Sequence, residues 1–211
     1  MPVPDFSDIE QRINDKYPNV DLTYNWDYPP TNQAIRNFYG EPIDGLTEEE
    51  FTVRLFQKFN EAFQNAAGNK DRIKEIINLI VYHWGGIHGN HEETIERYAD
   101  NLINGNLQEM ETDTGIASKS KILAAWNPNH YYIYDARVAI ALQKLYFNIY
   151  RFYIPTPQGN VDAVREELER SQGEAVTYPE FCEGLRNTQN GSQLEKKLFM
   201  LGGYIEENGL K

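Results

Sequence analysis

Cysteine is almost absent from the sequence, and long apolar runs are missing. The one cysteine, Cys182, can form neither an internal disulfide nor a cysteine zinc site, and we expect it to be inert. This usage favours a reducing compartment, so we expect a cytoplasmic protein. No apolar run approaches the roughly 18 residues that cross a membrane, so no membrane partner is expected. The N-terminus lacks the basic and apolar segments of a signal peptide.

Basic residues are scarce as well. The chain has 20 Lys and Arg against 32 Asp and Glu, a formal net charge of −12, which argues against broad affinity for nucleic acid. Residues 115–151 are the exception, because five basic residues stand there against Asp135 alone and give a local charge of +4. This basic segment predicts DNA as a partner, whereas chance clustering of charge predicts none. Its basic residues are Lys119, Lys121, Arg137, Lys144 and Arg151.

Convincing β-strand alternation, internal repeats and glycine-rich phosphate loops are all missing. Helical periodicity recurs in nearly every segment after Thr47, so we expect an all-α protein of about eight helices. We also expect the protein to be a monomer. Residues 46–211 are predicted to form a single helical domain, on which residues 1–45 pack as an irregular arm with one short helix from Ser7 to Lys16. Four aromatic residues of the arm are expected to anchor it, or alternatively to stack on a ligand: Trp26, Tyr28, Phe38 and Tyr39.

Capping residues mark the predicted helix starts. The pairs are Thr47 with Glu50, Asn90 with Glu93, Thr177 with Glu180, and Ser192 with Glu195. A further helix is expected from Lys70 to Trp84, where Gly85-Gly86 breaks it. A polar connection is expected over 106–113 and a short acidic helix around Val161, Val164 and Leu168. Gly202-Gly203 is expected to end or bend the last helix.

Three histidines, His83, His88 and His91, lie beside two glutamates and straddle the Gly85-Gly86 break. Two histidines four residues apart on a helix would share one face, but no helix fixes the geometry of these three. We therefore predict no metal site and interpret the segment as a polar turn of the kind that lines a cleft.

The central stretch, residues 115–145, holds the most suggestive chemistry. A helix is expected from Ser118 to Trp126, ended by Asn127-Pro128-Asn129, and an extended tyrosine run follows at 131–134. Asp135 has the place of an N-cap for a second helix. The apolar face of that helix should carry Val138, Leu142, Leu145 and Ile149.

This stretch resembles the helix-hairpin-helix DNA glycosylase superfamily, and more closely its 8-oxoguanine DNA glycosylase branch. There a glycine-containing hairpin leads to a catalytic lysine and its helix, and a proline-containing loop leads to an aspartate that opens the next helix. The matching elements are Gly115-Ile116, Lys119 or Lys121, Pro128 and Asp135, with weaker matches at Trp84-Gly85-Gly86, Leu194-Glu195 and Leu198-Phe199. The hairpin is reduced here to residues 114–117, and the lysine-to-aspartate spacing is about one helical turn shorter than in the family.

The resemblance implies a DNA glycosylase-like helical fold and a lysine imine mechanism that excises damaged, oxidised bases in base excision repair, a hydrolase or lyase activity without a cofactor. Lys121 comes first as nucleophile because Ile122-Leu123 follows it, and Lys119 comes second because of its distance from Gly115. Asp135 would stabilise positive charge on the sugar. The residues expected to bind substrate are Trp84, Arg137, Tyr134 and Phe199.

Simpler interpretations stay open beside the enzymatic one. Lys119 and Lys121 are two residues apart, so they point in different directions. We expect either one to be buried and the other to meet solvent, or both to be solvated. Asp135 is sufficiently explained as a cap, and the tyrosine run as core. The main alternative is a non-catalytic binding or regulatory protein on the same scaffold, and a third hypothesis is an enzyme that acts on another nucleobase or nucleoside.

Overall fold

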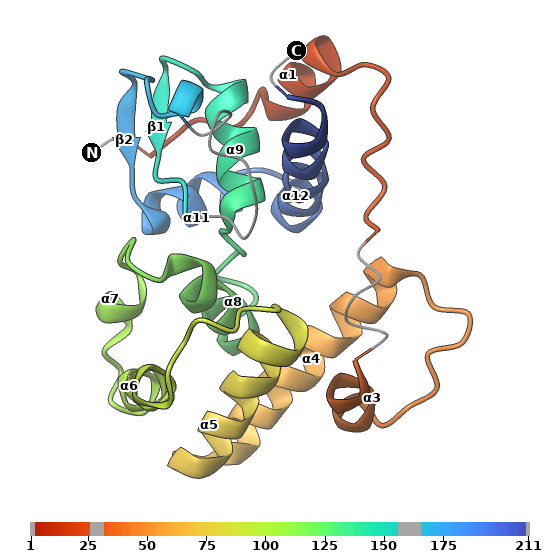
Figure 1. Ribbon diagram of the computed structural model, residues 1–211, viewed down its shortest axis with the longest axis vertical. Coiled ribbons are helices and arrows are strands. Elements are labelled where there is room, and N and C mark those ends of the chain that lie inside the picture. The colour runs from red at the N-terminus through yellow and green to blue at the C-terminus, as the bar shows by residue number, and fades with distance from the viewer. Residues whose placement is uncertain (1–2, 26–31, 156–165, 210–211) are drawn as a thin grey trace. The chain divides into compact units, whose positions relative to one another are not determined.

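A computed structural model of the chain describes residues 3–25, 32–155 and 166–209 (Figure 1). Helices make up 61% of the structure, and the described ranges contain eleven helices and one sheet of two short strands. The prediction of an all-α class is confirmed at this level, although the small sheet was not predicted. No helix in the described ranges is long and apolar enough to cross a membrane.

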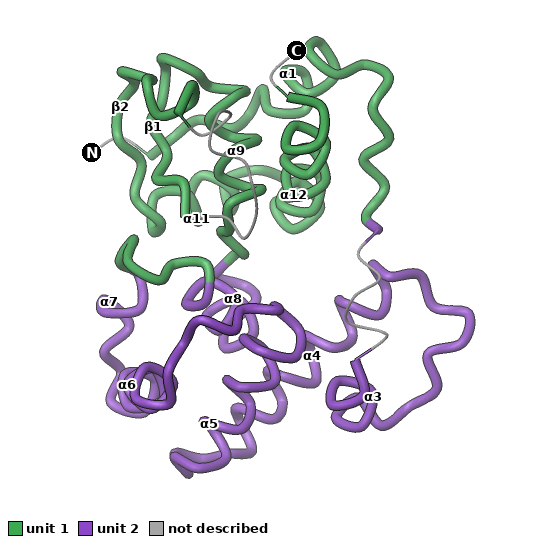
Figure 2. Tube along the Cα trace, viewed as in Figure 1, with its two compact units in different colours: residues 1–24, 112–117, 132–211 green, residues 25–111, 118–131 purple. Residues whose placement is uncertain are grey.

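The chain divides into two compact units, which Figure 2 colours separately. Unit 1 consists of residues 1–24, 112–117 and 132–211, and unit 2 of residues 25–111 and 118–131. The predicted division into an arm, 1–45, and one domain, 46–211, stays a prediction.

Unit 2 is built from helices alone. They are α3 (Gln33–Tyr39), α4 (Glu48–Ala66), α5 (Lys70–Asn78), the π-helix η1 (Leu79–Trp84), α6 (Glu92–Ile103), α7 (Leu107–Met110) and most of α8 (Ile116–Trp126). The predicted capping box opens α4, because the Glu50 amide donates to Thr47 Oγ1 at 3.2 Å and the Thr47 amide donates to the Glu50 carboxylate at 2.9 Å. The phenylalanines that repeat every four residues along α4 are buried.

Helix α3 forms within the segment that was predicted to be irregular. Asn32 caps it, and Oδ1 of its side chain accepts hydrogen bonds from the amides of Ala34 and Ile35. The ring of Phe38 stacks on Phe59 at 4.8 Å, and Tyr39 is buried. Phe38 and Tyr39 therefore anchor this segment, as predicted, whereas Trp26 and Tyr28 lie outside the described residues.

The helix predicted from Lys70 to Trp84 is present, but its last six residues change from α to π geometry. The amide of Gly85 donates to the carbonyl of Ile80, five residues back, at 2.8 Å. The capping box predicted at Asn90 and Glu93 is wrong, since His91 is the N-cap residue of α6 and makes no side-chain capping bond. The connection expected at 106–113 contains the single turn of α7.

Unit 1 combines helices with the sheet. Its elements are α1 (Ile9–Lys16), α9 (Ala136–Leu145), β1 (Tyr150–Phe152), β2 (Glu174–Val176), α11 (Tyr178–Arg186) and α12 (Gly191–Asn208). Helices α9 and α12 lie side by side in Figure 1 and make the main helix–helix contact of the unit. The predicted capping box of Thr177 and Glu180 opens α11. The Ser192–Glu195 cap is wrong, because α12 begins at Gly191 and runs through Gly202-Gly203 to Asn208.

The sheet is parallel, and Arg151 of β1 pairs with Ala175 of β2. The other edge of β1 is held by Gln143 of α9, whose side chain donates to the Tyr150 carbonyl at 3.0 Å and accepts from the Phe152 amide at 2.8 Å. Because α9 ends at Leu145, the prediction that Ile149 continues its apolar face is wrong, and Ile149 is exposed. The predicted helix residues Val161 and Val164 lie outside the described residues.

Candidate functional site

Helix α8 carries both candidate nucleophiles. It spans the predicted range from Ser118 to Trp126 and begins two residues earlier, at Ile116. Lys119 and Lys121 are both buried, with 7% and 3% of their surface exposed. The expectation that one of them meets solvent is therefore wrong. The stretch from 118 to 125 is buried throughout, so α8 has no solvent face to offer either lysine there.

Gly85 makes room for the side chain of Lys121 within unit 2. A Cβ placed on residue 85 would lie 3.1 Å from Cδ of Lys121, which is closer than ordinary van der Waals contact. The same Cβ would also approach the carbonyl oxygens of Ile80 and Val81, at 3.0 and 2.9 Å. The glycine after η1 thus allows the aliphatic part of Lys121 to pack against the end of the π-helix.

A short hydrogen-bonded chain connects η1 to the first turns of α8. The hydroxyl of Tyr82 donates to the backbone carbonyl of Asn90, and the Asn90 side-chain amide donates to Oγ of Ser118 at 2.9 Å. Ser118 is itself buried and directly precedes Lys119. No sequence pattern predicts this link, because the residues around Asn90 favour a helix cap instead.

Asp135 takes up its predicted N-cap position in unit 1. Its Oδ1 accepts hydrogen bonds from the amides of Arg137 and Val138, at 3.1 and 3.2 Å. The side chain of Arg137 lies over the ring of Phe199, 4.9 Å from its centroid, so these two predicted substrate-binding residues do come together. Nε of Arg137 also donates to the carboxylate of Glu206 at 3.1 Å. Burial raises the pKa of Glu206, and the charge of Arg137 offsets part of that rise.

The other two predicted substrate-binding residues are packed as core. Tyr134, in unit 1, is buried, and its hydroxyl donates to the Tyr153 carbonyl at 2.7 Å. Burial raises the pKa of Tyr134 well above its usual value. Trp84, in unit 2, is 1% exposed, and its ring meets Phe56 edge to face at 4.7 Å. The interpretation of the tyrosine run as core fits Tyr134.

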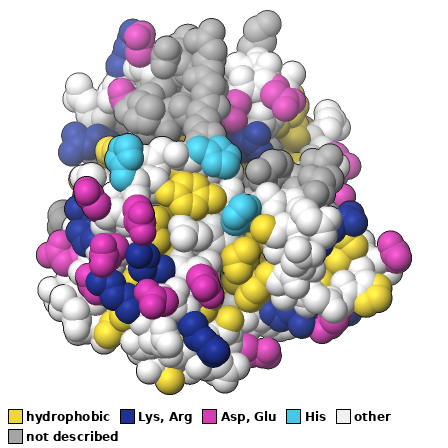
Figure 3. All heavy atoms as spheres, turned by 60° about the horizontal axis from the view of Figure 1, so that its bottom comes forward, with side chains coloured by type: hydrophobic (Ala, Val, Ile, Leu, Met, Phe, Trp, Pro, Cys, Tyr) yellow, Lys and Arg dark blue, Asp and Glu magenta, His cyan; other side chains and the backbone are white. Residues whose placement is uncertain are grey.

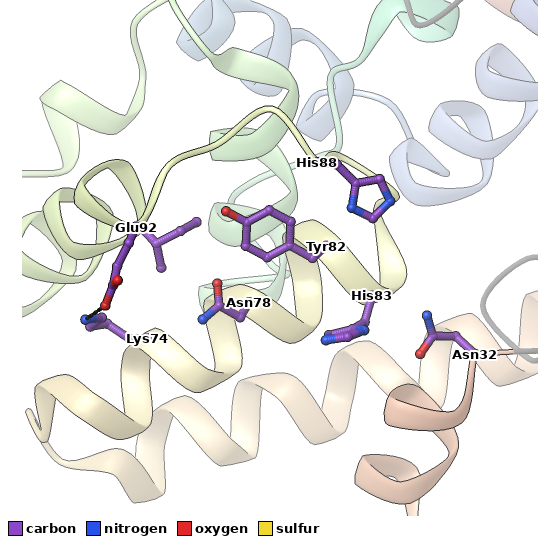
Figure 4. A pocket seen from close by; sticks show the side chains of 8 residues that line it. Asn32, Lys74, Asn78, Tyr82, His83, His88 and Glu92 are labelled. Carbon is purple, nitrogen blue, oxygen red and sulfur yellow. Dashed lines mark hydrogen bonds and ion pairs between the residues drawn. The ribbon is translucent and has the colours of Figure 1, made fainter.

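Unit 2 also contains a cavity of about 560 Å³, which Figure 4 shows from close by. The π-helix and the turn after it contribute three of its side chains, Tyr82, His83 and His88. The other lining residues are Asn32, Lys74, Asn78, Glu92 and Ile95. The prediction that the histidine turn lines a cleft is confirmed for His83 and His88. In the described chain, no group of three or more His, Cys, Asp and Glu side chains is placed to hold a metal ion.

No protein-family model, curated protein or solved structure matches this chain. The likeness of residues 115–145 to the DNA glycosylases is therefore a prediction from sequence, and the geometry of the two units must carry the functional argument.

Proposed function

We propose that this chain is a DNA glycosylase-like enzyme that uses a lysine of α8 as its nucleophile. The burial of Lys119 and Lys121 is the observation that supports this proposal most. Lysines are rarely buried in folded proteins, and nucleophilic lysines are found withdrawn from water in apolar surroundings. Gly85 also supports the proposal, because a glycine at this position leaves space for the side chain of Lys121.

The proposed chemistry begins when a damaged nucleotide is flipped out of the duplex. Nζ of Lys121 attacks C1′ of the deoxyribose while the bond from C1′ to the base breaks, and the electron pair leaves with the base, which takes up a proton. Loss of the amine proton and opening of the sugar ring then leave an imine between Nζ and C1′. A carboxylate would stabilise the positive charge that develops on the sugar, the role that the resemblance assigns to Asp135.

Borohydride trapping tests this proposal directly, because it reduces the imine to a permanent cross-link. We expect the wild-type chain to cross-link to a duplex containing an oxidised base, and Lys121→Ala to abolish the cross-link. Lys119→Ala should keep the cross-link, because Lys121 remains as the nucleophile. Lys70→Ala is the matched control, since its amine pairs with Glu96 and Asp100 on the surface of the same unit and should not matter. Thermal unfolding of each variant shows whether it is folded.

The second candidate is a non-catalytic binding or regulatory protein, and the net charge of −12 favours it. DNA binding depends on basic side chains that meet phosphates, and both lysines of α8 are buried. If no lesion-bearing duplex is trapped by the folded wild-type chain, the enzymatic proposal is wrong and this alternative replaces it.

A further inference from the structure

We infer that the cavity beside η1 in unit 2 binds a neutral, planar, hydrogen-bonding heterocycle of the nucleobase or nucleoside class. Its volume of about 560 Å³ lies within the range of small-molecule sites, about 300–1,000 Å³. Binding there needs no lysine chemistry, so this site and the proposed glycosylase activity can fail separately.

The lining side chains come from four segments of unit 2, one of which is α6 with Glu92 and Ile95 (Figure 4). Asn78, Tyr82 and His83 project from the end of α5 and from η1, His88 comes from the turn after η1, and Asn32 comes from the start of α3. Figure 3 shows histidine side chains gathered on one face around hydrophobic side chains. The cavity thus combines polar edges with an apolar surface, as sites for aromatic heterocycles do.

Two of the lining side chains, Tyr82 and His88, are aromatic rings in contact with each other. The rings of Tyr82 and His88 are nearly parallel, with an interplanar angle of 16° and centroids 6.2 Å apart. The Tyr82 hydroxyl is fixed by its hydrogen bond to the Asn90 carbonyl, so this ring is held in place. A fixed aromatic surface favours a ligand that is itself flat, because planar rings stack in offset or edge-to-face arrangements.

Several hydrogen-bonding groups of the cavity make no hydrogen bond to the part of the chain that the structure describes. In the described chain, no hydrogen bond engages the side chains of Asn78, His83 or His88, and the Asn32 amide uses only its oxygen, to cap α3. An asparagine amide offers a donor and an acceptor side by side, and a neutral imidazole offers one of each. Such pairs match the alternating donors and acceptors along the edge of a nucleobase.

The charges of the cavity favour a neutral ligand. Lys74 is the one lysine or arginine among the lining residues, and its Nζ lies 3.4 Å from the Glu92 carboxylate. The Glu92 carboxylate offsets the charge of Lys74 and so weakens the attraction of the cavity for a phosphate or carboxylate. A base or nucleoside therefore fits the lining better than a nucleotide or an organic acid.

The π-helix gives a local reason for this cavity. A π-helical turn is rare and occurs often at functional sites. Here it covers Leu79–Trp84, which includes both Tyr82 and His83. The same segment buries Ile80 and Trp84 in the core, whereas Tyr82 and His83 line the cavity.

Equilibrium binding of free ligands tests the inference. The panel contains adenine, guanine, cytosine, uracil, 8-oxoguanine and their nucleosides, with inorganic phosphate as the anionic probe, measured by calorimetry and ligand-observed NMR. We expect at least one base or nucleoside to bind with a dissociation constant below about 1 mM. Asn78→Ala and His83→Ala should each weaken it about 3- to 10-fold, the effect of one lost hydrogen bond.

Two controls make the outcome decisive. Asn101→Ala removes an asparagine of α6 that does not line the cavity, and it should leave binding unchanged. Lys121→Ala should also bind the ligand. If the wild-type chain binds a base but traps no DNA, the inference about this cavity stands and the enzymatic proposal is wrong. The inference is overturned if folded wild type binds no member of the base panel, if phosphate competes for the site, or if neither cavity variant weakens binding.

Discussion

Gly202 of α12 lies against the backbone of Arg137 in α9: a Cβ on residue 202 would stand 2.0 Å from the Arg137 carbonyl oxygen. The two helices therefore meet at this point without a side chain between them. Any larger residue at 202 has to push the helices apart, because the atoms it meets belong to backbone and cannot rotate away. The contact also fixes the start of α9, where Asp135 and Arg137 lie.

We predict that Gly202→Ala destabilises the protein by about 2 kcal/mol or more, since overpacking costs about 1–3 kcal/mol and outweighs the gain in helix propensity. Gly203→Ala is the matched control in the next position of α12. A Cβ there would lie no closer than 3.6 Å to the Arg137 side chain, so this variant should be neutral or up to about 1 kcal/mol more stable. Urea unfolding of both variants compares them, and equal stabilities would contradict the close helix contact.

We expect the ionisation of Asp8 to make the free energy of unfolding depend on pH in acidic solution. The Arg12 guanidinium donates to Asp8 at 2.7 Å and lowers the pKa of that carboxyl, and the Tyr146 hydroxyl adds to the effect. A depressed pKa contributes stability that is present above the unfolded value, near 3.8, and is lost as the pH falls through the folded value.

Asp8→Asn should therefore cost up to about 1 kcal/mol at pH 7, a small amount because the carboxylate is partly exposed and screened by solvent. The difference from wild type should shrink as the pH is lowered below about 4. Thermal unfolding of wild type and variant across pH 2–7 measures this, with Asp15→Asn on the same helix as control. A difference that stays constant with pH would show that the ion pair is not its source.

Gln143 should be required for the edge of the sheet. Its side chain is 1% exposed and forms hydrogen bonds with both the Tyr150 carbonyl and the Phe152 amide. It therefore provides β1 with the backbone partners that a neighbouring strand would otherwise supply. Gln143→Met keeps the volume but leaves the Phe152 amide without this partner, while the Tyr150 carbonyl still accepts from Ser171 Oγ at 3.2 Å. The loss of a partner costs about 1–3 kcal/mol for a buried group. We expect faster hydrogen exchange of the Phe152 amide, whereas Gln193→Met on the exposed side of α12 should change neither exchange nor stability.

The helix starts that depend on local chemistry could be predicted from the sequence. Thr47 with Glu50 and Thr177 with Glu180 cap helices because both partners of each box lie within one turn, so no tertiary contact is needed. The Asn90–Glu93 pair has the same pattern and fails. Tertiary structure uses the Asn90 carbonyl and amide to connect Tyr82 with Ser118 instead, and a pattern of four residues carries no information about such partners.

The features missed by the sequence analysis are those that depend on distant contacts. Strands of three residues are too short for alternation to be seen. Strand β1 is held by the side chain of Gln143 and by β2, and β2 lies more than 20 residues away along the chain. The π-helix keeps the same apolar residues as an α-helix, so periodicity alone does not reveal it. The burial of both lysines was missed for a related reason, because spacing predicts a direction on the helix and not which faces are covered.

The last prediction separates the structural role of Asp135 from a catalytic one. Its side chain caps α9 through two backbone amides, and asparagine is as good an N-cap as aspartate. Asp135→Asn should therefore keep stability within a few tenths of a kcal/mol, whereas Asp135→Ala should lose about 1 kcal/mol. If the glycosylase proposal holds, the asparagine variant should release bases at least about 100-fold more slowly than wild type despite its intact fold, because the charge that stabilises the sugar cation is gone. Base release and thermal unfolding, measured side by side on both variants, decide the matter: full activity in a stable Asp135→Asn protein would leave Asp135 with the cap alone.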